Sequence, residues 1–409
     1  ILRCGRSIRS HRHPFEFMKV VAHLLPNYNP FPPVYPAGTE LRVAEVSRRQ
    51  KRYRPVVICG GFPGQAKHER DGAMAIERIH FGRVYRRLFQ KLTRLDPYPY
   101  GRRMWLRIVG VNADVLHIHN EPKLLAMLAP FLAKVSLPVV MHVANDKPVR
   151  RDLLPLVSRW VACSHYMAAW LRDTVGVPRE YIDVIYTGVD VPSRPPVWAI
   201  PAKERETLRH RWGVKSDEYV FLFAGRLVKE KGVVEMLDAF ELLNTDKPIR
   251  LLVAGNVRDS KDPKNEKAAY GRAVVERMAQ MERVTWVGSL HPAEMHEFLL
   301  AGDAFLLPSL WNDPFPTVMI EAACAGLPLI AGRRGGITEF LDACPGLTLL
   351  ETPEDPAQLA TEMMALLCDA GRGEASGRWL RARVVAGFDW SRVTADFEAL
   401  YDRLLGGSP

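Results

Sequence analysis

Two cations in the second half of the sequence stand where they could bind a phosphate group. Arg226 and Lys231 flank a glycine-bearing turn in "FAGRLVKEKG" (223–232), which follows an apolar segment and precedes a helical pattern. Such a turn suits a diphosphate, because free backbone amides, the helix dipole and fixed positive charge act together at a helix N-terminus. The same residues also fit a solvated loop, and the motif is neither a Walker A loop nor a GxGxxG fingerprint.

Two carboxylates, Asp313 and Glu321, follow in "DPFPTVMIEAACAGLPLIAG" (313–332). Asp313 comes after the apolar "FLLPSL", so we expect it in a loop at the carboxyl end of a strand, with Glu321 on the next helix. Carboxylates in this position can accept paired hydrogen bonds from the hydroxyl groups of a sugar. Backbone groups at the start of that helix could contact the same ligand. They belong to Phe315, Pro316, Thr317 and Val318.

Short apolar segments alternate with helical patterns along the chain, which is typical of parallel α/β units. The predicted strands lie at 19–25, 55–61, 114–120, 138–145, 160–165 and 182–188, and then at 219–225, 249–256, 284–290, 304–310 and 327–332. The pattern predicts two doubly wound parallel sheets. Because ligands bind outside the carboxyl ends of such strands, we expect the site in a central cleft between the two domains.

The Pro-rich segment "VPSRPPVWAIP" divides the two series of strands and indicates a linker. The predicted parts are an N-terminal domain at 18–190, a linker at 191–205, a C-terminal domain at 206–385, and a C-terminal helix within 386–409 that packs back on the first domain. Residues 1–17 are basic, lack the apolar stretch of a signal peptide and precede "MKVVAHLL". We interpret them as a disordered leader or as upstream sequence.

The composition of the 409 residues, 47% hydrophobic and 25% charged, is that of a globular protein, and no apolar run is long enough to span a membrane. The six cysteines are scattered, without a CxxC pair or a His at ligand spacing. We therefore expect reduced, buried thiols in a cytoplasmic protein, and neither disulfides nor a zinc site.

Charge is divided unevenly between the two halves of the chain. The first 200 residues hold 31 Lys and Arg against 15 Asp and Glu, whereas the rest hold 25 against 31. The first half should therefore meet an anionic partner: a phospholipid surface, a lipid-linked diphosphate or a charged saccharide. Nucleic acid is not expected, because no recognised binding motif accompanies the basic half.

The segment 83–107 carries eight of these cations and one acid among apolar side chains. On a helix, Val84, Leu88, Leu92 and Leu95 would form an apolar stripe with basic flanks, as in helices that lie on membranes. An ordinary amphipathic helix that packs on the core has the same pattern, and the sequence leaves both alternatives open.

Four sequence segments together resemble the retaining GT-B glycosyltransferases of family 4. They are "FAGRLVKEKG", the Asp313-x7-Glu321 pair, "CAGLPLIAGRRGGITEF" and "VACSHYMAAWL...YTGVD". "DVLHIHNEP" and "MHVANDKP" are similar to the branch that builds bacterial surface or coat polysaccharides. The resemblance implies a GT-B fold and transfer of a sugar from a UDP- or GDP-linked donor to a saccharide or lipid-linked acceptor. It also implies a cytoplasmic enzyme that can contact the inner face of the cytoplasmic membrane.

The resemblance also assigns roles to individual residues. Arg226 and Lys231 match the residues that hold the nucleotide diphosphate as leaving group, and Glu321 matches the one that binds the donor ribose. Asp313 falls near the donor sugar, and His119 falls beside the reaction centre. Further donor-side candidates are Gly38, Gly225, Asn256 and residues Phe315, Pro316, Thr317 and Val318; acceptor-side candidates are His142, Asn145 and Asp146.

Three positions depart from the family pattern. Asp313 is shorter than the usual Glu, Pro316 replaces a common Gly and removes an N–H, and Ala144 stands where a His is often found. His142, on the same strand face as Ala144, is a candidate substitute.

The sequence has no Asp-x-Asp motif on which a metal could hold the diphosphate, so we expect no metal or other cofactor, and electrostatic stabilisation by Arg226 and Lys231. The alternatives are a phosphorylase or epimerase of the same fold and a catalytically inactive GT-B domain that serves as a binding or assembly module.

Overall fold

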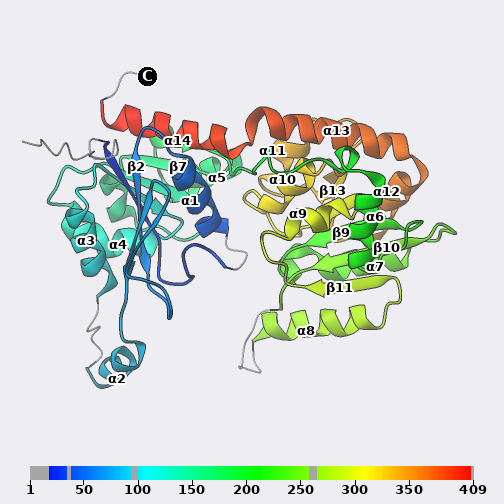
Figure 1. The fold of residues 1–409 in the computed structure, drawn as a ribbon, viewed down its shortest axis with the longest axis horizontal. Coiled ribbons are helices and arrows are strands. Elements are labelled where there is room, and N and C mark those ends of the chain that lie inside the picture. The colour runs from blue at the N-terminus through cyan, green and yellow to red at the C-terminus, as the bar shows by residue number, and fades with distance from the viewer. Residues whose placement is uncertain (1–17, 35–37, 94–98, 258–264, 348, 407–409) are drawn as a thin grey trace, which may run out of the picture.

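The computed structural model describes residues 18–34, 38–93, 99–257, 265–347 and 349–406. They form two α/β domains, each built on one sheet, at the left and right of Figure 1. This is the predicted fold class. The predicted leader at 1–17 lies outside the described residues. Among the helices of the described part, none is long and apolar enough to cross a bilayer.

The N-terminal domain contains an eight-stranded sheet in the order β3-β4-β2-β1-β5-β6-β7-β8, parallel except for β3. Its strands are β1 (Val20–Leu24), β2 (Arg54–Gly60), β3 (His68–Asp71), β4 (Met74–Ile79), β5 (Val115–His119), β6 (Val139–Val143), β7 (Arg159–Ala162) and β8 (Ile182–Val184). Its helices are α1 (Gly38–Arg49), α2 (Arg83–Thr93), α3 (Tyr100–Gly110), α4 (Pro122–Leu132) and α5 (His165–Trp170), with short 3-10 or π turns at Arg151–Leu156, Leu171–Val175 and Arg179–Tyr181.

The C-terminal domain contains a six-stranded parallel sheet in the order β11-β10-β9-β12-β13-β14. Its strands are β9 (Tyr219–Ala224), β10 (Ile249–Ala254), β11 (Val284–Gly288), β12 (Ala304–Leu307), β13 (Leu329–Gly332) and β14 (Leu349–Leu350). Its helices are α6 (Ala202–Arg211), α7 (Val233–Glu241), α8 (Glu266–Ala279), α9 (Met295–Leu300), α10 (Thr317–Cys324), α11 (Ile337–Leu341), α12 (Pro356–Cys368) and α13 (Ala370–Gly387), with 3-10 turns at Val197–Ala199 and Lys229–Lys231.

Strand order reverses once in each sheet, between β1 and β5 in the first and between β9 and β12 in the second. Segments that leave adjacent strands at such a point go to opposite faces and open a crevice at the carboxyl edge, where ligands bind. The candidate residue His119 ends β5, and Gly38, Arg226 and Asp313 come after β1, β9 and β12. The topology therefore places them where the sequence predicts a site.

The chain returns to the first domain at its C-terminal end. Helix α13 lies along the C-terminal domain, and α14 (Trp390–Leu404) lies over the N-terminal sheet (Figure 1). The Glu398 carboxylate accepts hydrogen bonds from the backbone N–H groups of Lys51 and Arg52 at 2.7 and 2.8 Å. Helix α14 thus ties the C-terminal end of the chain to the segment between α1 and β2.

Several boundaries differ from the sequence-based expectation. Strands β3, β4 and β14 were not predicted, because β3 and β14 are short and because charged residues stand side by side in β3 and β4. Helix α6 begins at Ala202, inside the predicted linker. The segment 83–107 forms two helices, α2 and α3, with Pro97 and Pro99 between them in the sequence. Cys368 is exposed, so the expectation of buried thiols fails there; Cys59, Cys163, Cys324 and Cys344 are buried.

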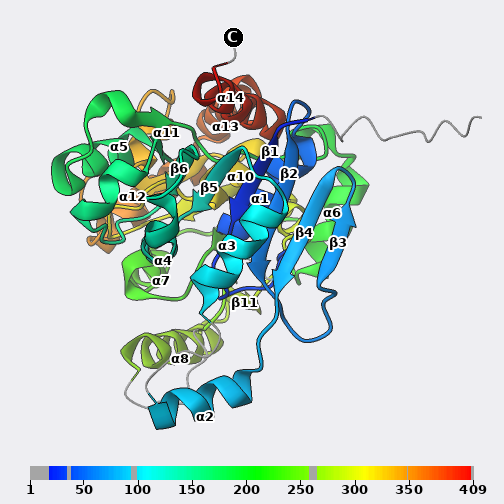
Figure 2. The same ribbon diagram turned by 90° about the vertical axis from the view of Figure 1, so that its left-hand side faces the viewer.

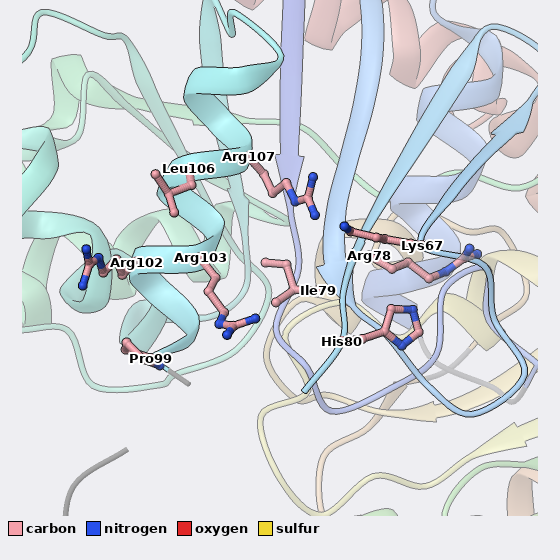
Figure 3. A pocket seen from close by; sticks show the side chains of 9 residues that line it. All are labelled: Lys67, Arg78, Ile79, His80, Pro99, Arg102, Arg103, Leu106 and Arg107. Carbon is pink, nitrogen blue, oxygen red and sulfur yellow. The ribbon is translucent and has the colours of Figure 1, made fainter. Parts of the chain in front are cut away.

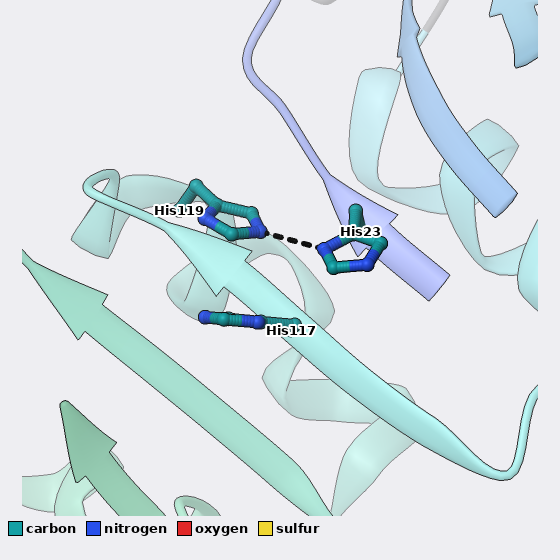
Figure 4. A group of neighbouring side chains, drawn as sticks. All are labelled: His23, His117 and His119. Carbon is teal, nitrogen blue, oxygen red and sulfur yellow. Dashed lines mark hydrogen bonds between the residues drawn. The ribbon is translucent and has the colours of Figure 1, made fainter. Parts of the chain in front are cut away.

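Four histidines gather on one face of the N-terminal sheet, beneath α1 and α14. Register pairs His23 with His117 and His119 with His142, so all four point to the same side. His23 Nδ1 lies 3.0 Å from His119 Nε2, with His117 stacked beside them (Figure 4). His117 Nδ1 in turn lies 2.7 Å from the hydroxyl of Tyr401 on α14. All four imidazoles are at most 2% exposed.

Ring nitrogens of His23, His117 and His119 come within 4.8 Å of one another, close enough to consider a metal ion. A cation already lies beside this group, because Arg42 on α1 is 5% exposed and donates to His142 Nε2 at 2.9 Å. Placing a second cation next to a buried guanidinium is electrostatically costly. We therefore interpret the cluster as a hydrogen-bonded part of the core.

Burial lowers the pKa of all four histidines, that of His23 to about 4, and the charge of Arg42 also contributes at His117, His119 and His142. The folded protein therefore holds these rings neutral at pH values where the unfolded chain protonates them. Stability should fall as the pH decreases from about 6.5 toward 4, with up to about 3 kcal/mol from His23 alone.

Urea unfolding at pH 7.5 and 5.5 checks this expectation. The wild-type midpoint should fall at the lower pH, and the fall should be smaller in His23→Gln but unchanged in His210→Gln, an exposed control. Equal midpoints at both pH values in the wild type would contradict the assignment of buried neutral histidines.

Candidate active site

Two helix N-termini from different domains meet at the domain boundary. Helix α1 begins at Gly38, after β1, and α10 begins at Thr317, after β12. A Cβ atom added to Gly38 would lie 4.0 Å from Thr317 Oγ1. Both helices therefore direct their unpaired first-turn amides and positive dipole ends toward one place, which is a favourable environment for an anion.

The turn after β9 supplies the two predicted cations. Gly232 ends its 3-10 turn with φ of 66°, and a Cβ there would lie 2.0 Å from the carbonyl oxygen of Pro308. Only glycine permits this approach, which brings the turn against the segment that follows β12. Arg226 is exposed, and in the described parts of the chain no carboxylate forms an ion pair with it. Its charge is therefore available to a ligand.

Lys231 and Asp313 form an ion pair across the two strand ends. Their side chains are only 12% and 8% exposed, and the Lys231 Nζ also lies 5.9 Å from the ring centre of Trp311. The carbonyl oxygen of Asp313 accepts a hydrogen bond from Gly336 N–H at 2.8 Å. The structure thus brings together two residues that the sequence assigned separately to phosphate and sugar, and each neutralises the other.

Glu321 faces the linker between the domains. Its Oε1 lies 3.0 Å from Nη1 of Arg194, a linker residue that the sequence analysis did not single out. Burial raises the pKa of Glu321, and the Arg194 charge partly offsets this effect. Arg381 on α13 donates to the carbonyl oxygen of Arg194 at 2.8 Å and so fixes the linker against α10. A ribose bound at Glu321 would share the carboxylate with Arg194.

The predicted acceptor-side residues divide into buried and accessible ones. His119 is 2% exposed and bound to His23, so its ring is part of the buried cluster in this conformation. His142 is completely buried against Arg42, and its replacement of the missing His at Ala144 stays a prediction. The Asn145 Oδ1 atom is buried without a partner among the described residues, and Asp146 is exposed.

The remaining donor-side candidates contribute mainly backbone. Phe315 stacks on Phe388 with ring centres 5.9 Å apart, so its side chain belongs to the core. Pro316 precedes α10, whose first residues are Thr317 and Val318. Gly225 and Asn256 follow β9 and β10, and Asn256 is exposed.

Glu339 on α11 connects the two domains and was missed by sequence reasoning. Its carboxylate accepts hydrogen bonds from the backbone N–H groups of His165 and Tyr166, at the start of α5, and from the hydroxyl of Tyr186 at 3.0 Å. The residue lies in the quoted "GGITEF", but its partners are more than 150 positions away, so no local pattern indicates the contact. Because α11 directly follows Gly336, the contact also supports Asp313.

Glu339→Gln should loosen this contact between the domains. The amide keeps one acceptor oxygen but loses the charge that strengthens both backbone hydrogen bonds, at a cost of about 1–3 kcal/mol. The amides of the segment 164–167 should then exchange with solvent about tenfold faster or more, as measured by hydrogen exchange and mass spectrometry.

Glu351→Gln is the matched control for Glu339→Gln. It removes a carboxylate from an exposed ion pair with Arg333 and should leave exchange in this segment unchanged. Equal exchange in Glu339→Gln and the wild type would show that the contact does not hold the domains together.

Two family models match consecutive parts of the chain. The first, described as "Glycosyltransferase Family 4", matches residues 36–192, and the second, described as "Glycosyl transferases group 1", matches residues 204–379. Together they cover both domains and leave only the ends and part of the linker unmatched.

Relatives and solved structures agree with these matches. The chain is 27% identical to lipopolysaccharide 1,2-N-acetylglucosaminetransferase of Salmonella typhimurium, over 93% of this chain and 97% of the relative. It is 26% identical to spore coat protein SA of Bacillus subtilis, over 76% and 83%. The fold is similar to that of sucrose-phosphate synthase from Thermosynechococcus elongatus, with a TM-score of 0.78 and 19% identity over 95% of this chain and 100% of that one. It is also similar to that of Anabaena HepE in complex with UDP and glucose, with a TM-score of 0.71 and 20% identity over 94% of this chain and 99% of that one. The chain therefore belongs to the GT-B glycosyltransferases, with a family 4 domain followed by a group 1 domain.

Proposed function

We propose that this glycosyltransferase moves a sugar from a nucleotide-diphosphate sugar to a saccharide or lipid-linked saccharide in bacterial cell-surface polysaccharide or lipopolysaccharide synthesis. The observation that carries the proposal is the meeting of the α1 and α10 N-termini at the edge where the exposed Arg226 follows β9, the strand next to β12. The arrangement suits a diphosphate, which is the group that such a donor releases. The Salmonella relative, a lipopolysaccharide transferase by name, and the UDP bound to HepE support the choice of substrates.

The proposed reaction is metal-independent and retains the anomeric configuration. Negative charge develops on the departing diphosphate as the sugar–oxygen bond breaks, and Arg226 and the two helix ends stabilise it without reorganising. Lys231 adds its charge when the diphosphate competes with Asp313 for the ammonium group. The released phosphate takes the proton of the attacking acceptor hydroxyl on the same face of the sugar.

The two carboxylates have separate proposed roles on the donor. Glu321 accepts hydrogen bonds from the ribose hydroxyls, and Asp313, on the loop after β12, orients the transferred sugar. Asp146, which is exposed, is the proposed acceptor-side residue, whereas His119 acts by positioning through its hydrogen-bonded neighbours.

Thermal-shift measurements with UDP, GDP, ADP and CMP, without added metal, test the donor site. A nucleotide present at 100 times its dissociation constant should stabilise the protein by about 2.7 kcal/mol. Arg226→Ala should abolish the shift, because the exposed guanidinium has no other described ion-pair partner, while Lys229→Ala, an exposed cation of the same turn, should keep it.

The outcomes of the nucleotide screen separate the alternatives. A shift with one nucleotide, followed by sugar transfer, supports the proposal; a shift without any turnover favours an inactive binding module. Absorbance of a bound pyridoxal cofactor would favour a phosphorylase. No shift with any nucleotide would contradict the donor site.

We also propose that the N-terminal domain docks on anionic membrane through α2. The exposure of its apolar stripe supports this proposal: Val84, Leu88 and Leu92 are 75%, 57% and 83% exposed, so they do not pack on the core. Leu95 lies outside the described residues. Helix α2 extends away from the sheet (Figures 1 and 2), and its basic flanks suit anionic headgroups.

Flotation with vesicles that contain an anionic phospholipid tests this docking at physiological salt. The wild type should float, and Leu88→Ser/Leu92→Ser should float markedly less, because it removes two apolar side chains that would enter the interface. Leu242→Ser, which changes a comparably exposed leucine in the C-terminal domain, should behave as the wild type. A wild type that stays wholly in solution would contradict the proposal.

A further inference from the structure

A basic pocket of about 640 Å³ lies in the N-terminal domain, between the carboxyl end of β4 and the first half of α3 (Figure 3). We call it the β4–α3 pocket. Its polar lining consists of Lys67, Arg78, His80, Arg102, Arg103 and Arg107.

Among the described residues no carboxylate lines the β4–α3 pocket, although two carboxylates pair with arginines that do. Glu69 pairs with Arg78 at 2.6 Å, and Glu77 lies 3.5 Å from Arg107. Lys67 and Arg102 are exposed, and within the described ranges neither pairs with a carboxylate. The pocket therefore keeps an excess of positive charge, which is unfavourable unless an anion binds.

The wall formed by β4 is rigid. The Arg78 side chain is only 1% exposed, and its guanidinium donates to the carbonyl oxygen of Phe31 at 2.7 and 3.2 Å and to that of Ala66 at 2.9 Å. The His80 ring occupies the space beside Gly61, where a Cβ atom would come within 2.6 Å of it. Arg78 and His80 thus form a preorganised basic wall, with the exposed Lys67 on the same side and the cations of α3 across the pocket (Figure 3).

The pocket lies on the same sheet edge as the candidate active site. Strands β4 and β5 are separated by β2 and β1, so three strand spacings, about 14 Å, lie between the end of β4 and His119 at the end of β5. This is the domain to which the sequence and the proposed function assign the acceptor. A group bound there would be a remote part of the acceptor rather than the attacking sugar.

We propose that the β4–α3 pocket binds a phosphate group carried by the acceptor saccharide, away from the transferred sugar. The inference rests on the proposed function, because it assigns the acceptor to the N-terminal domain. Guanidinium groups match phosphate oxygens in paired hydrogen bonds, and several cations suit a dianion better than a single carboxylate. Contacts to this remote group supply binding energy that holds the attacking hydroxyl in place.

Titration of the full chain with glucose 6-phosphate, followed by the ³¹P line width, tests the pocket, with inorganic phosphate as a second probe. Lys67→Glu/Arg102→Glu should weaken binding at least tenfold, because it reverses two accessible charges without touching the buried Arg78. Lys134→Glu/Arg151→Glu makes the same change in net charge on exposed residues of the same domain outside the pocket and should bind as the wild type.

Arg226→Ala separates the pocket from the donor site, since free phosphate could also enter the latter. Binding retained in Arg226→Ala and lost in the pocket variant supports the proposal. Binding lost in Arg226→Ala and retained in the pocket variant would overturn it, and so would equal binding in all variants.

Two further measurements distinguish a lipid headgroup from a saccharide phosphate, and a failure of the pocket proposal from a failure of the proposed donor site. If the pocket variant loses flotation with anionic vesicles but binds glucose 6-phosphate as before, the cations contact lipid headgroups and the proposal fails. The nucleotide thermal shift of the pocket variant should equal that of the wild type. A wild type that binds glucose 6-phosphate in the pocket but no nucleotide would contradict the proposed donor and leave the anion site standing.

Discussion

The carboxylate of Glu339 receives three hydrogen bonds from the N-terminal domain, and the geometry of the active site depends on them. Two come from consecutive amides at the start of α5 and one from the hydroxyl of Tyr186. Helix α11, which carries Glu339, follows a glycine turn whose Gly336 holds the carbonyl oxygen of Asp313. A shift between the domains would therefore move Asp313 and its partner Lys231 relative to the N-terminal domain.

Among the described residues, the charges assigned to the donor site are balanced within the protein except that of Arg226. Lys231 is neutralised by Asp313 and Glu321 by Arg194, so each carboxylate already has a cation before a donor binds. Arg226 has no such partner among the described residues. The proposed diphosphate would complete this arrangement, because it would bring charge for Arg226 and enough oxygen atoms to draw Lys231 away from Asp313.

The sequence predicts the part of the site that is local in the chain. Arg226 and Lys231 stand in one turn, and Asp313 and Glu321 in one loop and helix, so strand and helix patterns suffice to place them. The switch points of the two sheets then follow from the parallel topology. The fold and the candidate residues of each half can therefore be predicted without knowledge of the contacts between the halves.

Contacts between distant segments could not be predicted in the same way. The partner of Glu321 is a linker residue, and the imidazole of His119 is buried by a cluster that includes Tyr401 on the last helix. The charged strands β3 and β4 lack the apolar periodicity that identifies a strand, yet β4 forms one wall of the basic pocket. The apolar stripe of α2 is clear in the sequence but ambiguous, because buried and exposed helices share this pattern and only the packing distinguishes them.

Binding of the proposed donor does not explain the excess positive charge of the first half of the chain. Both cations assigned to the diphosphate, Arg226 and Lys231, lie in the C-terminal domain, which has more acidic than basic residues. The cations of the N-terminal domain gather instead along α2 and around the end of β4, on the side of the sheet where parallel strands present their ligands. Charge at that edge acts on whatever approaches the domain, since it is solvent-accessible and the attraction is long-ranged at low salt. With the proposed function, this distribution gives donor and acceptor separate electrostatic surfaces, and the basic surface is the one on the proposed acceptor side.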